Sequence, residues 1–357
     1  MNSRERVLAV LHGERPDRVP VATNFYPTTM RQIGGADPDE HFNTDLRYAR
    51  FPTPEPQSAF LAYLRALPED VHVGSDDILR TYHDWGYHPE VPDFSAWGDL
   101  HTVEAFAARF AAEPLPDFIT PDVRQRLADQ VAGYHARGLA VMGSPPHLGG
   151  ELFETAFRMR GFQQFMVDLI ANPDLVRYLL DQLTAMHVTT SLALTHAGVD
   201  ILGLDDDIGE PTRMLLSPEH WRQFFRPCYA LIIQACRAVN PDLRVFYHSD
   251  GCFTPIIPDL IEIGVNVINP IQPDVMDPAA LKRRYGDRLA FWGTVGTPQR
   301  WAWASPERIR AEVRERIETV GAGGGLILSP AYDLEPEVRW ENVIAFFEAA
   351  REHGRYN

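Results

Sequence analysis

Residues 244–251 read Arg244-Val245-Phe246-Tyr247-His248-Ser249-Asp250-Gly251, a short apolar run that ends in polar side chains and a glycine. Runs of this kind recur eight times along the chain, at residues 19–25, 71–75, 139–144, 199–204, 244–248, 265–269, 289–293 and 325–329. Most are too short for a helix, and several are rich in Val and Ile. Such runs are typical of strands that are buried on both faces, as in a parallel sheet.

Helical patterns separate these runs, at residues 4–11, 57–67, 122–137, 173–197, 217–239, 308–320 and 337–353. Strands that alternate with helices can form a (β/α)8 barrel or a doubly wound open sheet. The count of eight favours the barrel. We therefore predict an α/β fold, a (β/α)8 TIM barrel, that spans residues 1–357 as a single domain. Residues 26–70 are longer than an ordinary strand-to-helix connection, which predicts an elaborated N-terminal region.

Composition excludes several classes of protein. The 357 residues include 33 Lys plus Arg and 49 Asp plus Glu, which gives a formal net charge of −16. Such an acidic chain repels nucleic-acid phosphates, and no run of about 18 apolar residues would span a membrane. Residues 1–18 lack the apolar core of an export signal, so we expect a cytoplasmic protein. Cys228, Cys236 and Cys252 form no CxxC pair and no disulfide framework.

His248 and Asp250 are the most informative candidates for chemistry, because active sites of barrels form at the carboxyl ends of the strands. Side chains two residues apart on a strand point the same way, so both can face the barrel mouth. Imidazole and carboxylate can bind a divalent metal, or the carboxylate can orient the imidazole for acid–base catalysis. A hydrogen-bonded histidine beside a turn-forming Asp-Gly is the structural alternative, and spacing leaves these options open.

Other runs also end in polar side chains. Tyr332, after the last run, can donate a proton or form a wall of the pocket. For substrate binding we select Asp76, Asp205, Asp206, Asn269 and Gln272. The alternatives are a solvated loop or a helix cap for each carboxylate, and a turn for the asparagine that precedes a proline.

A set of segments spread over the chain points to a known family. In order they are Arg4-Glu5-Arg6-Val7-Leu8, Pro16-Asp17-Arg18-Val19-Pro20-Val21, residues 205–209, Ser217-Pro218-Glu219, Arg226-Pro227, His248-Ser249-Asp250-Gly251, residues 264–272 and Glu341-Asn342-Val343-Ile344-Ala345. Together they resemble the uroporphyrinogen decarboxylase superfamily, which also contains corrinoid-linked methyltransferases. The resemblance covers essentially the whole chain and implies a (β/α)8 barrel.

Two branches of that superfamily can be compared with this chain. True uroporphyrinogen decarboxylases have two arginines in a segment just after the first strand, whereas Met30-Arg31-Gln32-Ile33-Gly34-Gly35 has one. Their substrate carries many carboxylates, so the loss of a cation weakens this branch. The zinc methyltransferases have His-x-Cys and a further Cys near the last strand. This chain has His248, Asp250 and, approximately, Tyr332 at those positions, which implies a divergent member with an oxygen-preferring site.

The resemblance implies an enzyme that moves a methyl group between a small methylated substrate and a corrinoid or similar carrier, with a corrinoid protein as partner. His248 and Asp250 would bind a divalent metal, zinc in the related enzymes, or activate the substrate, and Tyr332 would assist proton transfer. A decarboxylase of uroporphyrinogen or of a smaller carboxylated substrate, with Arg31 holding a carboxylate, is the alternative. A third is a catalytically inactive barrel that binds a ligand. The resemblance also implies a homodimer.

Overall fold

The computed structural model describes residues 1–25, 32–52, 97–147, 150–296, 298–332, 334 and 338–356. Its centre is a parallel sheet of seven strands in the order β1-β2-β3-β4-β5-β6-β7. The strands are β1 (Leu46–Ala49), β2 (Ala140–Gly143), β3 (Ile201–Asp205), β4 (Arg244–His248), β5 (Val267–Asn269), β6 (Ala290–Trp292) and β7 (Leu326–Ile327). Neighbours in the sheet are also consecutive in the chain, as in a barrel.

The sheet closes on itself through the first apolar run. Val21 forms a parallel bridge with Leu328, just after β7. The amide of Leu328 donates to the carbonyl of Pro20 at 2.9 Å, and the amide of Asp45, just before β1, donates to the carbonyl of Val21 at 2.8 Å. This run therefore lies between β7 and β1 as an eighth, very short segment of the ring. The predicted TIM-barrel fold is confirmed.

The second strand of the ring is not the one that the sequence predicted. That place is taken by β1, which pairs with β2 and lies inside the stretch 26–70 that was expected to be a loop. The apolar pattern misses β1 because Arg47 interrupts it. The Arg47 guanidinium is buried and donates to the carbonyls of Thr44 and Leu46. The predicted strand at 71–75 and the predicted helix at 57–67 lie outside the described residues.

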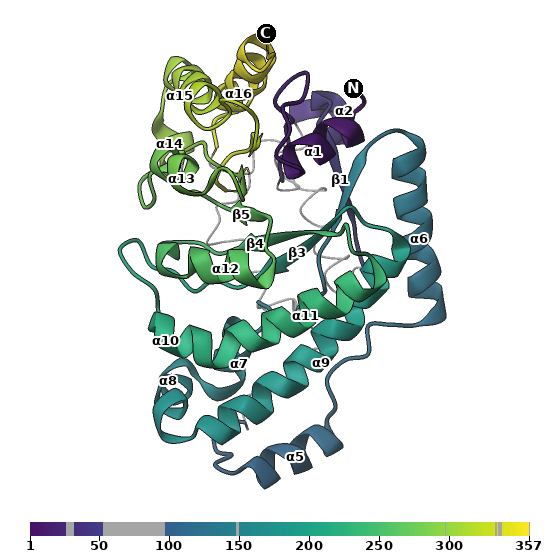
Figure 1. Ribbon diagram of the computed structural model, residues 1–357, viewed down its shortest axis with the longest axis vertical. Coiled ribbons are helices and arrows are strands. Elements are labelled where there is room, and N and C mark those ends of the chain that lie inside the picture. The colour runs from purple at the N-terminus through teal and green to yellow at the C-terminus, as the bar shows by residue number, and fades with distance from the viewer. Residues whose placement is uncertain are drawn as a thin grey trace.

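Helices surround the barrel and occupy the remaining predicted ranges. They are α1 (Ser3–Leu11), α2 (Pro38–Phe42), α5 (Val103–Ala112), α6 (Pro121–Ala136), α7 (Phe153–Arg160), α8 (Phe162–Ala171), α9 (Pro173–Ala197), α10 (Pro218–His220), η3 (Trp221–Phe225), α11 (Arg226–Val239), η4 (Thr254–Ile256), α12 (Ile257–Ile263), α13 (Pro278–Tyr285), α14 (Pro298–Trp303), α15 (Pro306–Thr319) and α16 (Trp340–His353). Figure 1 shows α11, α9 and α5 following one another outward from β3 and β4. Within the described ranges, no helix is long and apolar enough to cross a membrane.

Local sequence explains where several helices begin. The side-chain oxygens of Thr120 and Ser305 each accept a hydrogen bond from the amide of the third residue of the helix that follows. A proline is the first residue of each of these helices. The side-chain oxygen satisfies an amide that has no partner within the helix. The proline lacks an amide hydrogen and has a helical φ, so it suits this position.

Alternation along the strands divides the apolar side chains into two cores. The side chains that point inward form a cluster inside the barrel, which also includes Val7, Val10 and Leu11 of α1. α1 packs on β1, β2 and β7, so it covers the amino-terminal end of the barrel. The outward side chains pack under the helices in a larger cluster. With one end filled by α1, the other end is left for a site.

Asp45 is the central charge at the seam where the barrel closes. Its side chain is fully buried and accepts two hydrogen bonds from Arg18, at 2.7 and 2.8 Å, and one from Arg6 at 2.7 Å. It also accepts the amide of Val21 at 2.8 Å, so one carboxylate joins α1, the first apolar run and β1. Removing one partner of a buried ion pair leaves the other charge uncompensated.

Asp45→Asn should therefore lower the free energy of unfolding by about 3–5 kcal/mol, because at nearly constant shape the Arg18 guanidinium loses its counter-charge and Arg6 keeps only its ion pair with Asp17. Urea unfolding followed by circular dichroism measures this difference. Asp287→Asn, at an exposed position, is the matched control. Equal stabilities of the Asp45 and Asp287 variants would contradict a central role for this carboxylate.

Candidate active site

Three adjacent strands bring polar side chains to one place at the carboxyl end of the barrel. Asp205 ends β3, His248 ends β4 and Asn269 ends β5, and in the sheet Asp205 pairs with His248 and His248 with Asn269. On β4 the alternation puts His248 on the same side as Phe246, which belongs to the cluster inside the barrel. These side chains therefore face the barrel mouth.

The His248 ring is held in one orientation by an amide. Its Nδ1 lies 2.6 Å from Oδ1 of Asn269, and Nδ2 of Asn269 donates to the carbonyl of Trp292 at 3.2 Å. Because the second bond fixes which atom of the amide is oxygen, Nδ1 of His248 must carry a proton and donate it. Nε2 then points to the carboxylates of Asp207, at 3.6 Å, and Asp250, at 3.9 Å.

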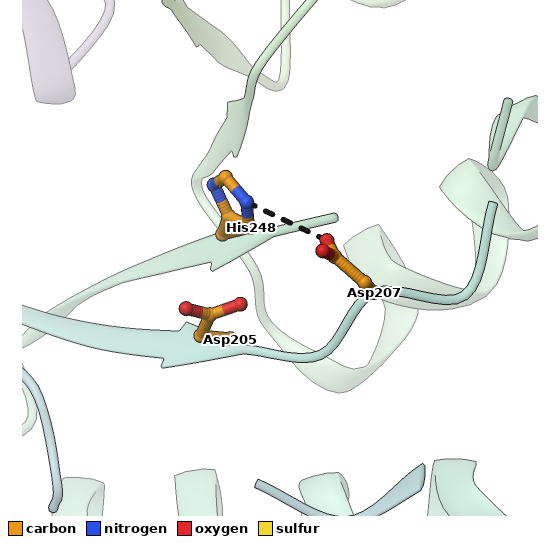
Figure 2. Close-up of side chains that lie close together, drawn as sticks. All are labelled: Asp205, Asp207 and His248. Carbon is orange, nitrogen blue, oxygen red and sulfur yellow. Dashed lines mark ion pairs between the residues drawn. The ribbon is translucent and has the colours of Figure 1, made fainter. Parts of the chain in front are cut away.

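Asp205, Asp207 and His248 form a group that could hold a metal ion. One potential ligand atom from each lies within 4.8 Å of the other two. Figure 2 shows Asp205 and His248 at the ends of neighbouring strands and Asp207 on the loop that follows β3. Burial alone would lower the pKa of His248, but the carboxylates of Asp205, Asp250 and Asp207 raise it to about 9. The site thus attracts positive charge.

Asp250 is held by the other residues predicted for the mouth. Its Oδ1 accepts from Nε2 of Gln272 at 3.0 Å, and its Oδ2 accepts from the hydroxyl of Tyr332. Its amide donates to Oδ1 of Asp207 at 2.6 Å. Burial raises the pKa of Asp250 to about 6, against the opposite effect of His248. Both carboxylate oxygens therefore already have partners, and Gln272 acts on Asp250 rather than pointing free into the mouth.

Asp206 lies away from the mouth. Its buried carboxylate accepts the amides of Phe153, at 2.7 Å, and Glu154, at 3.0 Å, which begin α7, and the hydroxyl of Tyr229 at 2.7 Å. The sequence predicted a substrate contact here, but the structure gives Asp206 the role of a helix cap, which was the alternative. Burial raises its pKa to about 7. Asp76, the other carboxylate predicted to bind substrate, lies outside the described residues.

Two further side chains of this region follow predicted strands but are not among the site residues selected from the sequence. Asp207 is the third of three consecutive aspartates, and the direction of each after the strand end depends on contacts made by the whole fold. His147 follows β2 and lies near Asp205, whose charge acts on its pKa. Its position just after an apolar run was the available signal. The structure therefore assembles His248, Asp250, Asn269, Gln272 and Tyr332 together with these two.

Behind the mouth lies a buried polar layer between the sheet and the helices. Glu151 is fully buried, and its carboxyl oxygens have no hydrogen-bond partner in the described structure. Burial, with the charges of Asp205 and Asp206, raises the pKa of Glu151 well above its usual range, which favours the neutral carboxyl group. His187 of α9 is also fully buried, and its Nε2 bonds the main-chain carbonyl of Glu151 at 3.0 Å. Burial lowers the pKa of His187 to about 3.

His187 should make the protein less stable in acid. Its folded-state pKa of about 3 lies below the value of 6.5 for the unfolded chain. Between these values only the unfolded state takes up the proton, so stability falls as the pH drops below 6.5. His187→Gln keeps a donor for the Glu151 carbonyl and removes this titration.

Urea unfolding at pH 6 and pH 4 checks the expectation. The wild type should lose about 1.4 kcal/mol per pH unit more than His187→Gln over this range. His12→Gln, at an exposed position on the turn after α1, controls for the exchange itself. Parallel pH dependence of wild type and His187→Gln would mean that the histidine is already charged or exposed in the folded state.

A closed parallel barrel with an imidazole and carboxylates at the carboxyl ends of its strands is the architecture of a (β/α)8-barrel enzyme. Residues 137–353 match the model of the uroporphyrinogen decarboxylase (URO-D) family. This match covers more than half of the chain, and the chain belongs to the uroporphyrinogen decarboxylase family.

Relatives in both branches are similar to this chain. The methylcobamide:CoM methyltransferase MtaA of Methanosarcina barkeri is 23% identical over 362 residues, which cover 98% of each protein. The uroporphyrinogen decarboxylase of Methylococcus capsulatus is 26% identical over 232 residues, 64% of this chain and 62% of that one. The solved structure of a methyltransferase from Methanosarcina mazei has the same fold, with a TM-score of 0.62 and 18% identity over 99% of each chain. The chain is thus a divergent member of the superfamily, related to methyltransferases and decarboxylases.

Proposed function

We propose that this protein is a methyltransferase that moves a methyl group between a small methylated substrate and a corrinoid or similar carrier. The observation that carries the proposal is the extent of similarity. The methyltransferase MtaA aligns over 98% of both chains, whereas the first decarboxylase relative aligns over 64% of this one. We place the protein in the cytoplasm as a homodimer with a corrinoid protein as its partner.

The site does not fit the thiolate-bound zinc of the related methyltransferases. Where those enzymes have His-x-Cys, this chain has His248 and Asp250, and Tyr332 bonds Asp250 near the position of the further Cys. Cys228 and Cys236 are buried on α11. Among the described residues, no cysteine belongs to the group around His248. The proposed reaction therefore does not use a zinc ion bound by thiolates.

Asp205, Asp207 and His248 instead fit a divalent cation that prefers oxygen ligands. Two carboxylates and one imidazole supply hard and borderline donors. Asn269 holds Nδ1 of His248 and leaves Nε2 for the cation, as partners of metal-binding histidines do. A bound cation would act as a Lewis acid on a polar group of the substrate. Asp250, with both oxygens engaged, positions Tyr332, which would exchange a proton with the substrate.

The metal site gives a direct comparison between two ligand sets. Isothermal titration of chelator-treated protein with Mn²⁺ or Zn²⁺ should show one binding site. Asp207→Asn and His248→Ala should each weaken it by about 10- to 100-fold or more. Asp250→Asn should retain the affinity, because an asparagine can still accept from Gln272 and bond Tyr332. If Asp250→Asn loses the cation while Asp207→Asn still binds it, the ligands are His248 and Asp250, as the sequence predicted.

Methyl transfer is tested with reduced cobalamin and a panel of methyl donors: methanol, methylated amines and methoxylated aromatics. The bond from the donor heteroatom to the methyl carbon breaks, the heteroatom keeps the electron pair and takes up a proton, and the reduced cobalt supplies the pair for the new bond. Methylcobalamin is measured by its absorbance. His248→Ala should lower kcat/KM by about 10²–10⁴-fold. Cys252→Ala, which removes a thiol outside the group, is the control.

A decarboxylase is the second candidate, since the matching family model is that of uroporphyrinogen decarboxylase. Tyr332 or a water would then protonate the carbanion left by carbon dioxide. The charge of the mouth argues against uroporphyrinogen, because Asp205, Asp207 and Asp250 would repel its many carboxylates. Formation of coproporphyrinogen from uroporphyrinogen would overturn the methyltransferase proposal. Failure of every donor, with a His248→Ala variant that has no cellular phenotype, would favour an inactive binding barrel.

A further inference from the structure

His147 is a second imidazole near the mouth, and the proposed methyl transfer does not use it. It lies four residues after the end of β2, beyond Ser144-Pro145-Pro146. Burial lowers its pKa, and the charges of Asp205, Arg158, His248 and Asp207 act on it as well. His147 thus follows β2, which pairs with β3, the strand that carries Asp205, and the charges of Asp205, Asp207 and His248 act on its ring.

A main-chain hydrogen bond fixes the state of the His147 ring. The amide of Gly150 donates to Nδ1 of His147 at 2.8 Å. An amide can donate only to a nitrogen with a free lone pair, so Nδ1 carries no proton. A charged imidazolium would place two N–H groups against each other. His147 is therefore neutral in this geometry, and its single proton is on Nε2.

Glycine is required at the donor position. Gly150 has a φ of +127°, which side-chain-bearing residues rarely adopt. A Cβ atom there would also lie 2.3 Å from Cβ and 2.4 Å from Oε2 of Glu154. The main-chain conformation of Gly150, which presents its amide to His147, therefore depends on the absence of a side chain at this position.

The remaining donor of His147 is available to a ligand. Within the described parts of the chain, no residue hydrogen-bonds its Nε2, and the ring is partly exposed. Of the charged groups that act on the ring, Asp205 and Asp207 are carboxylates and can only accept, whereas Arg158 pairs with Glu154 and His248 faces Asp207. An acceptor oxygen of a substrate needs a hydrogen-bond donor. A carboxylate can only accept, so Asp205 and Asp207 cannot take the place of the neutral Nε2–H group of His147.

We propose that His147 determines substrate specificity by donating its Nε2 proton to an acceptor oxygen, such as a carboxylate, of the methylated substrate. This inference rests on the proposed methyl transfer at the same site. It predicts a substrate whose methylated group is not repelled by the carboxylates of Asp205 and Asp207. The same substrate carries an oxygen atom that accepts a hydrogen bond from His147. A trimethylammonium group with a nearby carboxylate has both features, because the cation is attracted by Asp205 and Asp207.

The state of the ring is tested without any activity. Protein labelled with ¹⁵N-histidine is examined by long-range ¹H–¹⁵N correlation, and the His147→Gln variant identifies the signals of His147. An unprotonated Nδ1 and a protonated Nε2 are expected near pH 7. Gly150→Ala should lose this pattern while the signals of His248 persist. A doubly protonated ring, or a proton on Nδ1, would overturn the proposal.

Specificity is tested with two probes that share a trimethylammonium group, N,N,N-trimethylglycine and ethyltrimethylammonium. His147→Leu should raise KM for trimethylglycine by about tenfold, leave kcat nearly unchanged, and leave ethyltrimethylammonium unaffected. His147→Gln, which keeps an N–H donor, should recover part of the loss. Equal effects on both probes would show a structural role and overturn the proposal.

If the protein methylates cobalamin from neither probe, the methyl-transfer proposal fails for this substrate class and binding alone decides the role of His147. Both probes are then titrated into the labelled protein. A shift of the His147 Nε2 proton signal with trimethylglycine, absent with ethyltrimethylammonium, supports the donor role. No shift with either probe, or the same shift with both, overturns it.

Discussion

The buried carboxylate of Asp45 holds together the seam on which the barrel depends. It joins α1, the first apolar run and β1 through Arg6, Arg18 and the amide of Val21. The first run is too short to form a regular strand, so main-chain pairing alone gives a weak closure there. Charge-assisted hydrogen bonds to one buried carboxylate strengthen it. Closure in turn brings Tyr332, which follows β7, to Asp250, which follows β4, and so adds the phenol to the polar side chains at the ends of β3, β4 and β5.

Much of this arrangement could be predicted from the sequence, because strands with two buried faces leave a clear pattern. The same pattern identified His248, Asn269 and Tyr332, since parallel strands present their carboxyl ends at one mouth. The pattern did not predict the features that depend on tertiary contacts. β1 contains Arg47, whose charge pairs with Glu40 of α2 and whose other N–H groups bond main-chain carbonyls, which the apolar pattern does not reveal. Asp206 and Asp207 are adjacent in sequence, yet the first caps α7 and the second faces His248.

The replacement of thiolates by oxygen groups changes the chemistry that this mouth can perform. Asp250 accepts from Gln272 and Tyr332, so the position that carries a cysteine in the zinc methyltransferases here supports a phenol. His248 retains its strand-end position, with Asn269 fixing its orientation. Asp205 and Asp207 provide hard donors near its free nitrogen. The family's barrel is thus retained, and under the proposed function the oxygen groups around its histidine would favour a metal that prefers oxygen ligands.

The filling of the amino-terminal end by α1 limits how molecules can move through the protein. Val7, Val10 and Leu11 belong to the cluster inside the barrel, so packed side chains fill the barrel from its amino-terminal end. Whatever reaches His248 must enter and leave by the same opening. Under the proposed methyl transfer, a small substrate and a bulky carrier would share this opening, so the small molecule would enter before the carrier docks and its product would leave after the carrier departs. The proposed turnover would thus follow a fixed order.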